Sequence, residues 1–169
     1  MSIKKELADE MELTRQNFHH LLGSVPEDFY FHPSDNPAWT IGEVLHHITI
    51  GLSALRFELW MIRHARGLFQ LGLNIFPAKF FNKLNAQFGR RKKAPARQML
   101  AKAYENGHAG LVSSLLRISE DDFQKSVIYP ADLLPELTGK VSVERLFRYV
   151  IYHFDIHADQ IQKVLEKAQ

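Results

Sequence analysis

The sequence predicts an all-α protein, a four-helix bundle with up-down-down-up topology. Four segments carry apolar residues at the three-and-four spacing of an amphipathic helix, and no strand-like alternation is sustained anywhere. One connection between helices is also far longer than the few residues that usually join antiparallel neighbours. Because 169 residues suffice for one well-buried core, we expect a single four-helix-bundle domain over residues 1–169.

The start of the second helix is the clearest boundary in the sequence. Thr40 and Glu43 form a Thr-x-x-Glu capping box, and Trp39 and Val44 occupy the two positions of a hydrophobic staple. We therefore expect this helix to begin at Ile41. The first helix is expected over about residues 3–22.

Glycines are expected to end the first two helices. Gly23 follows the first, and Gly67 follows Arg66 at the expected end of the second; both positions suit a left-handed residue. The third helix opens near Pro95, and the fourth starts after Ser142 and continues to the C-terminus. Residues 119–140 are expected to be a loop.

The long connection, residues 68–94, indicates a crossover between the second and third helices. If those helices are parallel, the chain must return the whole length of the bundle between them. A short amphipathic helix within it is predicted by Phe76, Phe80, Phe81, Leu84 and Phe88. This segment from Phe76 to Phe88 either covers the flank or end of the bundle, or forms a dimer surface or pocket lid.

Composition excludes several classes of protein. The absence of cysteine rules out disulfides, a thiolate zinc site and a cysteine nucleophile. A formal charge of +2 is too small to indicate a nucleic-acid partner, and the basic run at residues 90–93 fits a solvated loop. The N-terminus lacks an apolar signal region, and residues 68–81 are too interrupted to span a membrane. We expect a cytoplasmic protein with no membrane partner.

Histidines are the remaining candidates for chemistry. His153 and His157 form the only pair at a four-residue spacing, and both project into the apolar stripe of the fourth helix. One metal ion could accept a lone pair from each neutral ring. Alternatively, each ring could be satisfied by a hydrogen bond, and spacing alone does not choose between these readings.

The second helix offers His46 and His47. A helical projection directs His46 to solvent and His47 to the edge of the buried face, from which it can reach a neighbouring helix. Glu43 could orient the ring of His47, but the capping box uses the same carboxylate, and its role stays open.

Three further positions bear on a possible site. Gln160 projects beside His153 and could orient a ligand, and His108 is the one other histidine near enough to an interior face to serve as a fourth ligand. Gly107 and Gly110 of the third helix either leave room for a small molecule or permit close helix packing.

Two motifs resemble those of the DinB-like (DinB/YfiT-like) superfamily of bacterial four-helix bundles. AWTIGEVLHHI is similar to a tryptophan-led motif whose histidine falls on His47, and HFDIHADQI is similar to a His-x-x-x-His motif followed by Gln-Ile. The resemblance implies a three-histidine site for a divalent ion such as zinc or nickel, made by His47, His153 and His157. It also implies a possible homodimer and a small-molecule substrate that could be a low-molecular-weight thiol.

Three histidines leave one coordination position open, as in catalytic rather than structural metal sites. Metal-assisted hydrolysis and thiol transfer are both consistent with such a site. The hypothesis is therefore a metal-dependent hydrolase or thiol S-transferase, with no substrate identified. The alternatives are a non-catalytic small-molecule binder or sensor, and a bundle whose histidines are only satisfied core residues.

Overall fold

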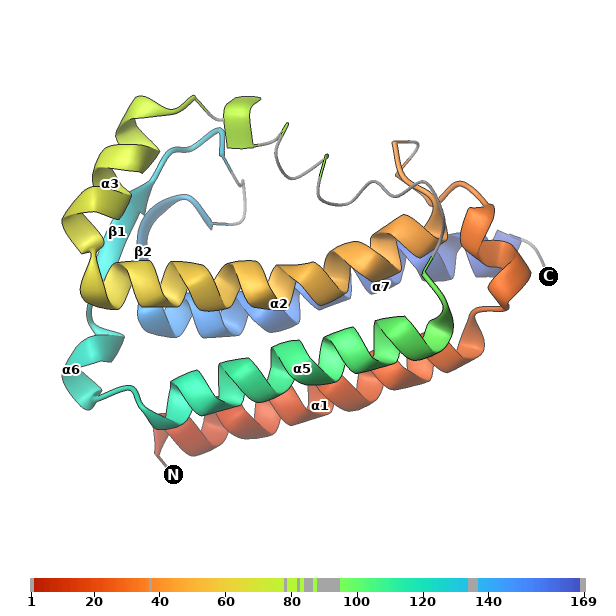
Figure 1. Ribbon diagram of the computed structural model, residues 1–169, viewed down its shortest axis with the longest axis horizontal. Helices are drawn as coiled ribbons and strands as arrows, with labels where there is room; N and C mark the ends of the chain where they lie inside the picture. Colours follow the sequence, from red (N-terminus) through yellow and green to blue (C-terminus); the bar gives the residue numbers. More distant parts are fainter. Residues whose placement is uncertain are drawn as a thin grey trace.

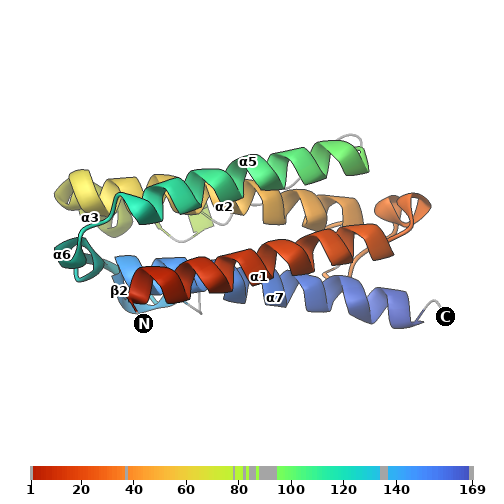
Figure 2. The same cartoon turned by 90° about the horizontal axis from the view of Figure 1, so that it is seen from below.

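The computed structural model describes residues 2–36, 38–77, 79–81, 83, 87, 95–133 and 137–167. Its core is a bundle in which each helix contacts two neighbours, with α1 and α2 each packed between α5 and α7 (Figure 1 and Figure 2). The bundle consists of α1 (Ile3–Ser24), α2 (Ile41–His64), α5 (Arg97–Leu116) and α7 (Val143–Lys167). No helix among the described residues is long and apolar enough to cross a membrane.

The expected topology is confirmed. In Figure 1, α2 and α5 run in the same direction, while α1 and α7 run the opposite way. Since α2 ends and α5 begins at opposite ends of the bundle, the chain between them must return along its length. This is the crossover that the long connection predicted.

The beginnings of α2 and α7 have the predicted caps. At α2, the Thr40 hydroxyl accepts a hydrogen bond from the backbone N–H of Glu43, whose carboxylate accepts from the N–H of Thr40. At α7, the hydroxyl of Ser142 accepts a hydrogen bond from the backbone N–H of Arg145. Trp39 is 8% exposed and Val44 is fully buried, as expected for the two positions of a hydrophobic staple.

Neither glycine ends its helix. α1 continues through Gly23 and stops where Val25 adopts an extended conformation, because Pro26 disfavours a helical residue before it. α2 breaks at Ala65, and Gly67 lies inside the next helix, α3 (Arg66–Ile75). Leu73 of α3 is buried in the core, so tertiary packing continues the helical chain beyond the glycine.

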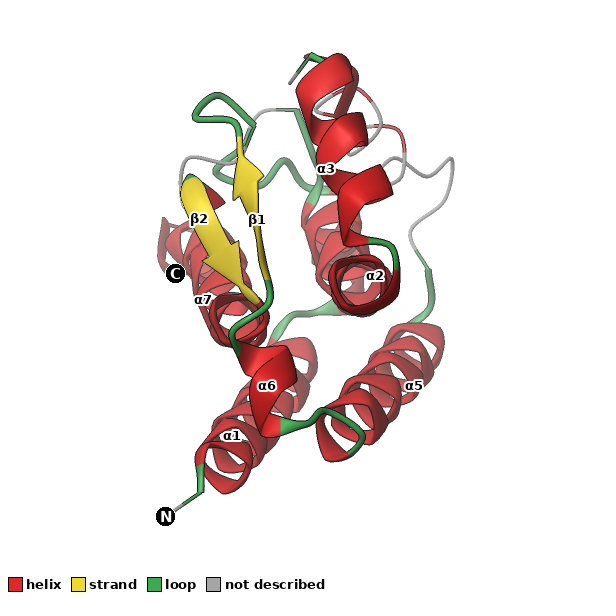
Figure 3. Ribbon diagram, turned by 90° about the vertical axis from the view of Figure 1, so that its left-hand side faces the viewer, coloured by secondary structure: helices red, strands yellow, loops and turns green. Residues whose placement is uncertain are grey.

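The expected loop over residues 119–140 is also wrong in part. It contains the short helix α6 (Glu120–Phe123) and the strand β1 (Ser126–Tyr129), which pairs antiparallel with β2 (Gly139–Ser142), as Figure 3 shows. Each strand has only four residues, too few for a sustained alternation. The hairpin is held by tertiary contacts: the Gln70 side chain of α3 both donates to the carbonyl of Ile128 and accepts from its N–H.

The hairpin also covers a partly buried carboxylate. Glu58 of α2 accepts a hydrogen bond of 2.6 Å from the hydroxyl of Tyr129 on β1. Burial raises the pKa of Glu58 to about 6, although the hydrogen bond from Tyr129 acts in the opposite direction. This hydrogen bond ties α2 to the hairpin.

The predicted helix in the crossover falls only partly on described residues. The helix that follows α2 is α3, which starts ten residues before Phe76. The rings of Phe76, Phe80 and Phe81 contact one another, with centroids 4.9 to 6.3 Å apart. Leu84 and Phe88 lie outside the described residues.

The short 3₁₀ helix η1 (Glu27–Phe31) links α1 to the turn before α2.

The two glycines of α5 permit close packing against α2. A Cβ atom at Gly107 would lie 2.8 Å from the Cβ of Leu52, which is 5% exposed and cannot move away freely. A Cβ atom at Gly110 would instead meet the guanidinium of Arg56, an exposed and flexible side chain. Gly107 therefore fixes the separation of α2 and α5, whereas Gly110 does not.

This contrast gives a prediction. Gly107→Ala should lower the free energy of unfolding by about 1 to 3 kcal/mol, because the added methyl overpacks the interface. Gly110→Ala should leave the free energy of unfolding unchanged or raise it by up to about 1 kcal/mol, because alanine favours the helix. Urea denaturation of both variants measures the difference. Equal losses of free energy of unfolding in the two variants would show that Gly107 is no more important than Gly110 to the contact between α2 and α5.

Candidate metal centre

Three histidines converge between α2 and α7. One ring nitrogen from each of His47, His153 and His157 lies within 4.8 Å of the others. The Nε2 atoms of His47 and His153 are 3.0 Å apart. Among the described residues, this is the one group of histidines and carboxylates close enough to share a metal ion.

The helices position these rings in simple ways. His153 and His157 are four residues apart on α7, so they stack on one face of the helix. His47 faces them from α2 and is 5% exposed. Gly51, one turn after His47 on α2, makes room for the ring of His153. A Cβ atom at position 51 would lie 2.8 Å from Cε1 of His153. Any side chain at position 51 would displace His153.

Neighbouring side chains orient two of the rings. Nδ1 of His157 lies 2.9 Å from the amide oxygen of Gln160. Because that oxygen can only accept, Nδ1 carries the proton and Nε2 keeps its lone pair. The indole of Trp39 lies 4.5 Å from the ring of His47 and 6.1 Å from that of His157, which excludes water from this side of the group.

Two of the three rings, those of His47 and His153, favour the uncharged state. Burial, followed by the proximity of His157 and His46, lowers the pKa of His47 to about 3. Burial, followed by the proximity of His157 and His47, brings the pKa of His153 well below its usual value. Both rings are therefore neutral near pH 7 and can donate lone pairs to a cation.

The residues fit a divalent transition metal. Tetrahedral zinc with imidazole ligands at about 2.0 to 2.1 Å holds its nitrogens about 3.3 Å apart, which lies between the 3.0 Å and 4.8 Å found for this group. Nδ1 of His47 is buried and has no hydrogen-bond partner among the described residues. Three neutral imidazoles form a donor set suited to zinc or nickel.

The helical projection predicted that His46 points to solvent, and this prediction is wrong. It is 6% exposed and therefore buried. The projection considers only the bundle side of α2, whereas α2 also contacts η1, which lies outside the four-helix core. His46 is nevertheless absent from the three-histidine group.

The other predicted positions are also placed by the structure. Gln160 contacts His157 rather than His153, and the carboxylate of Glu43 takes part in the capping box. His108 lies 3.9 Å from the carboxylate of Glu12, across the α1–α5 interface, and is not part of the histidine group. The roles of Gly51 and of the Trp39 ring were missed. The role of Gly51 could have been predicted from the sequence, because a glycine inside a helix, one turn after His47, indicates a close approach of another group.

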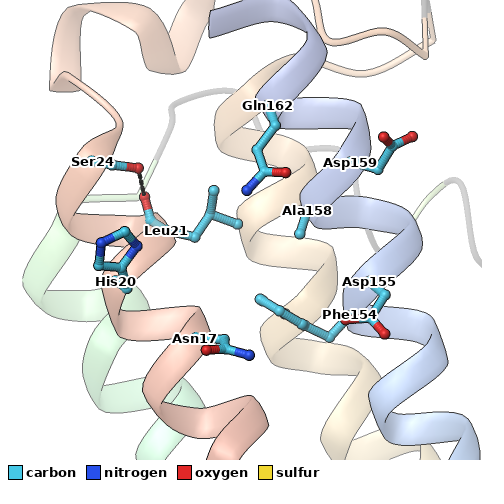
Figure 4. A pocket seen from close by; sticks show the side chains of 9 residues that line it. All are labelled: Asn17, His20, Leu21, Ser24, Phe154, Asp155, Ala158, Asp159 and Gln162. Atoms are coloured by element: carbon cyan, nitrogen blue, oxygen red, sulfur yellow. Dashed lines mark hydrogen bonds between the residues drawn. The ribbon is translucent and has the colours of Figure 1, made fainter. Parts of the chain in front are cut away.

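Two hollows lie near α7, and neither is lined by the three histidines. A groove of about 400 Å³ opens between α1 and α7 (Figure 4). Another of about 240 Å³ is lined in part by Tyr149, whose ring centroid lies 5.7 Å from that of His153. The groove in Figure 4 is lined by Asn17, His20, Leu21, Ser24, Phe154, Asp155, Ala158, Asp159 and Gln162.

Sequence comparison identifies the family. Residues 10–161 match the DinB superfamily, which is nearly the whole chain. The chain belongs to the DinB superfamily. The match includes all three histidines of the group between α2 and α7. No curated protein has a significant sequence match to this DinB-superfamily chain.

Solved structures share the fold at low sequence identity. A mycothiol-dependent maleylpyruvate isomerase is 16% identical with a TM-score of 0.67, over 95% of this chain and 61% of the isomerase. A Streptococcus pneumoniae protein is 18% identical with a TM-score of 0.67, over 98% of this chain and 92% of that one. An uncharacterized protein from Clostridium difficile 630 is 15% identical with a TM-score of 0.64, over 96% and 95%. The chain thus spans about three fifths of the isomerase.

The lowered histidine pKa values predict how stability depends on pH. For His47, the folded-state pKa of about 3 lies below the unfolded value of 6.5, so its contribution is complete above pH 6.5 and is lost as pH falls toward 3. The lowered pKa of His153 likewise makes the folded state less stable as pH falls. Between about pH 7 and pH 5, metal-free protein should therefore lose free energy of unfolding, by up to about 1.4 kcal/mol per pH unit for each ring.

Chemical denaturation in the presence of a chelator measures this loss. The double variant His47→Gln, His153→Gln removes both titrating rings and should show a shallower dependence over the same range. His20→Gln alters an exposed histidine and is the matched control. If the double variant and the wild type lose stability at the same rate, the two rings do not have the lowered pKa values described.

Proposed function

We propose that this DinB-superfamily chain is a metal-dependent enzyme that binds a divalent ion, zinc or nickel, through His47, His153 and His157. It acts as a hydrolase or a low-molecular-weight-thiol transferase on a small molecule. The observation that carries the proposal is the convergence of three imidazoles from two helices, with their ring nitrogens within 4.8 Å of one another. His47 is buried and the other two rings are partly buried, and polar groups in such surroundings are costly unless a hydrogen bond or a cation satisfies them.

The surroundings of the group fit a catalytic rather than a structural site. Three protein ligands leave a divalent ion one open position, where it would lower the pKa of a bound water or hold a thiol as thiolate. Gln160 fixes the tautomer of His157, and Gly51 leaves the space that the His153 ring occupies. Trp39 closes the side toward the start of α2, which keeps the local dielectric low.

Thiol chemistry is supported by one structural relative. The isomerase with the same fold is mycothiol-dependent, and a divalent ion stabilises the thiolate form of such a thiol at neutral pH. At 16% identity this relative supports a class of chemistry and no particular substrate. A small-molecule partner, rather than a macromolecule, is consistent with a site buried between two helices. A homodimer stays a prediction.

The first test is metal binding. Purified protein should carry about one transition-metal ion per chain, or take one up after chelation, and His157→Ala should abolish tight binding. His47→Ala should weaken it by at least the 10- to 100-fold that is typical when even an orienting partner is lost. His46→Gln should keep affinity within about threefold, because His46 is outside the group. Isothermal titration calorimetry with zinc and with nickel measures the affinity of each variant.

Gly51→Ala tests the geometry without removing a ligand. Its methyl would displace the His153 ring, so metal affinity should fall by about 10- to 100-fold. Gly110→Ala makes the same chemical change away from the histidines and is the control. If no variant of the three histidines or Gly51 changes affinity, or if no metal binds at all, the proposed site is wrong.

Turnover is a separate prediction. Metal-loaded protein should act on members of a panel of esters, amides and thiol-plus-electrophile pairs, and His153→Ala should abolish that activity. Hydrolysis without thiol would assign the hydrolase, and conjugation that requires thiol would assign the transferase. Ligand-induced stabilisation without turnover would instead identify a non-catalytic binder or sensor.

A further inference from the structure

Basic residues are concentrated in one continuous part of the chain. Residues 59–104 contain ten lysines and arginines and no aspartate or glutamate. Because the whole chain holds 21 basic and 19 acidic residues, the other 123 positions hold eleven basic and nineteen acidic ones. The small net charge of +2 therefore conceals a strongly basic segment within an acidic remainder.

α3, which lies within this segment, presents an apolar stripe that the described chain leaves uncovered. Leu68, Leu71 and Ile75 follow the spacing of one helix face and are 67%, 53% and 62% exposed. The opposite face packs on the protein, with Leu73 buried in the core. Figure 1 and Figure 3 show α3 standing away from the bundle beside β1, so its outer face does not meet another bundle helix.

Exposed cations lie at the two ends of α3, and exposed aromatic rings follow its last residue. Arg66 begins α3, Lys79 follows it, and neither side chain forms an ion pair with a described residue. Phe76 and Phe80 are stacked 4.9 Å apart and are 47% and 45% exposed. Neither α3 nor β1, on which it packs, contains an acidic residue. Large apolar side chains bordered by cations are typical of helices that bind at a lipid interface.

We propose that the outer face of α3, formed by Leu68, Leu71 and Ile75, docks on an anionic lipid surface, with Arg66 at the start of α3 and Lys79 beyond its end as the basic contacts. Its apolar side chains enter the acyl boundary while the basic side chains contact lipid phosphates. This binding is peripheral. It departs from the expectation of no membrane partner, which rested on the lack of a membrane-spanning segment.

A second copy of the chain is a poorer occupant for this face. In a two-fold dimer the same patch would face itself, and Arg66 and Lys79 would oppose their counterparts with no acidic residue of α3 or β1 between them. An anionic bilayer supplies the missing negative charge over an area of any size. The complementary charge therefore favours lipid.

The test is co-sedimentation of the full chain with vesicles. Binding should occur to phosphatidylcholine vesicles that contain phosphatidylglycerol, and only weakly to pure phosphatidylcholine. Raising salt from about 0.1 M to 1 M should release the protein, because the screening length falls from about 10 Å to 3 Å. The double variant Arg66→Gln, Lys79→Gln should weaken binding by about 25-fold, since each basic charge near such a surface contributes about fivefold.

A matched pair of apolar substitutions tests the stripe itself. Leu71→Gln with Ile75→Gln should weaken binding by about tenfold or more, because both side chains lose their contact with the acyl boundary. Leu13→Gln changes a leucine of α1 that is 58% exposed and should keep binding within about twofold. Circular dichroism confirms that each variant is folded, and none of these residues contacts the histidine group.

Three results would overturn the proposal. The first is no binding to anionic vesicles, or binding that the α3 variants leave unchanged. The second is salt-sensitive binding to polyglutamate without binding to vesicles, which would assign the face to an acidic protein. The third is self-association in analytical ultracentrifugation that Leu71→Gln abolishes, which would assign it to a second copy. Because metal binding is measured separately, the outcome is independent of the proposed enzyme activity.

Discussion

The close packing of α2 against α7 is the contact on which the histidine group depends. At Gly51 the backbone of α2 approaches the ring of His153 so closely that even a methyl group would not fit. That approach brings Nε2 of His153 to 3.0 Å from Nε2 of His47. The spacing of the two helices and the geometry of the three rings are therefore set by the same contact, and a change in one alters the other.

The same small region also joins the start of α2 to the histidines. Trp39 occupies the staple position just before α2, and its indole packs against His47, eight residues later. A residue that appears purely structural in the sequence thus also forms a wall of the site. Burial by such walls keeps the rings neutral, which favours a metal and makes protons its competitor at acidic pH.

The opposite end of α2 is organised differently. There, α3 and the β1–β2 hairpin form an addition to the bundle, held together by the amide of Gln70 and tied to α2 by the hydrogen bond between Tyr129 and Glu58. Exposed apolar residues lie on α3, with Arg66 at its start and Lys79 beyond its end, away from the histidines near the start of α2. Binding at α3 and chemistry at the histidines can therefore be separated by mutation.

The sequence by itself determined the helix order, the parallel direction of α2 and α5, the capping box at Thr40 and the three histidines that converge. The helices, the cap and the parallel direction follow from local periodicity, from capping chemistry and from the length of one connection, whereas the set of three histidines was implied by the resemblance of its two motifs to the DinB-like family. Only the tertiary structure decided the burial of His46, the helix beyond Gly67, the hairpin and the role of Gly51. Each of these depends on what another part of the chain places against the residue, and a periodic pattern contains no information about such a partner.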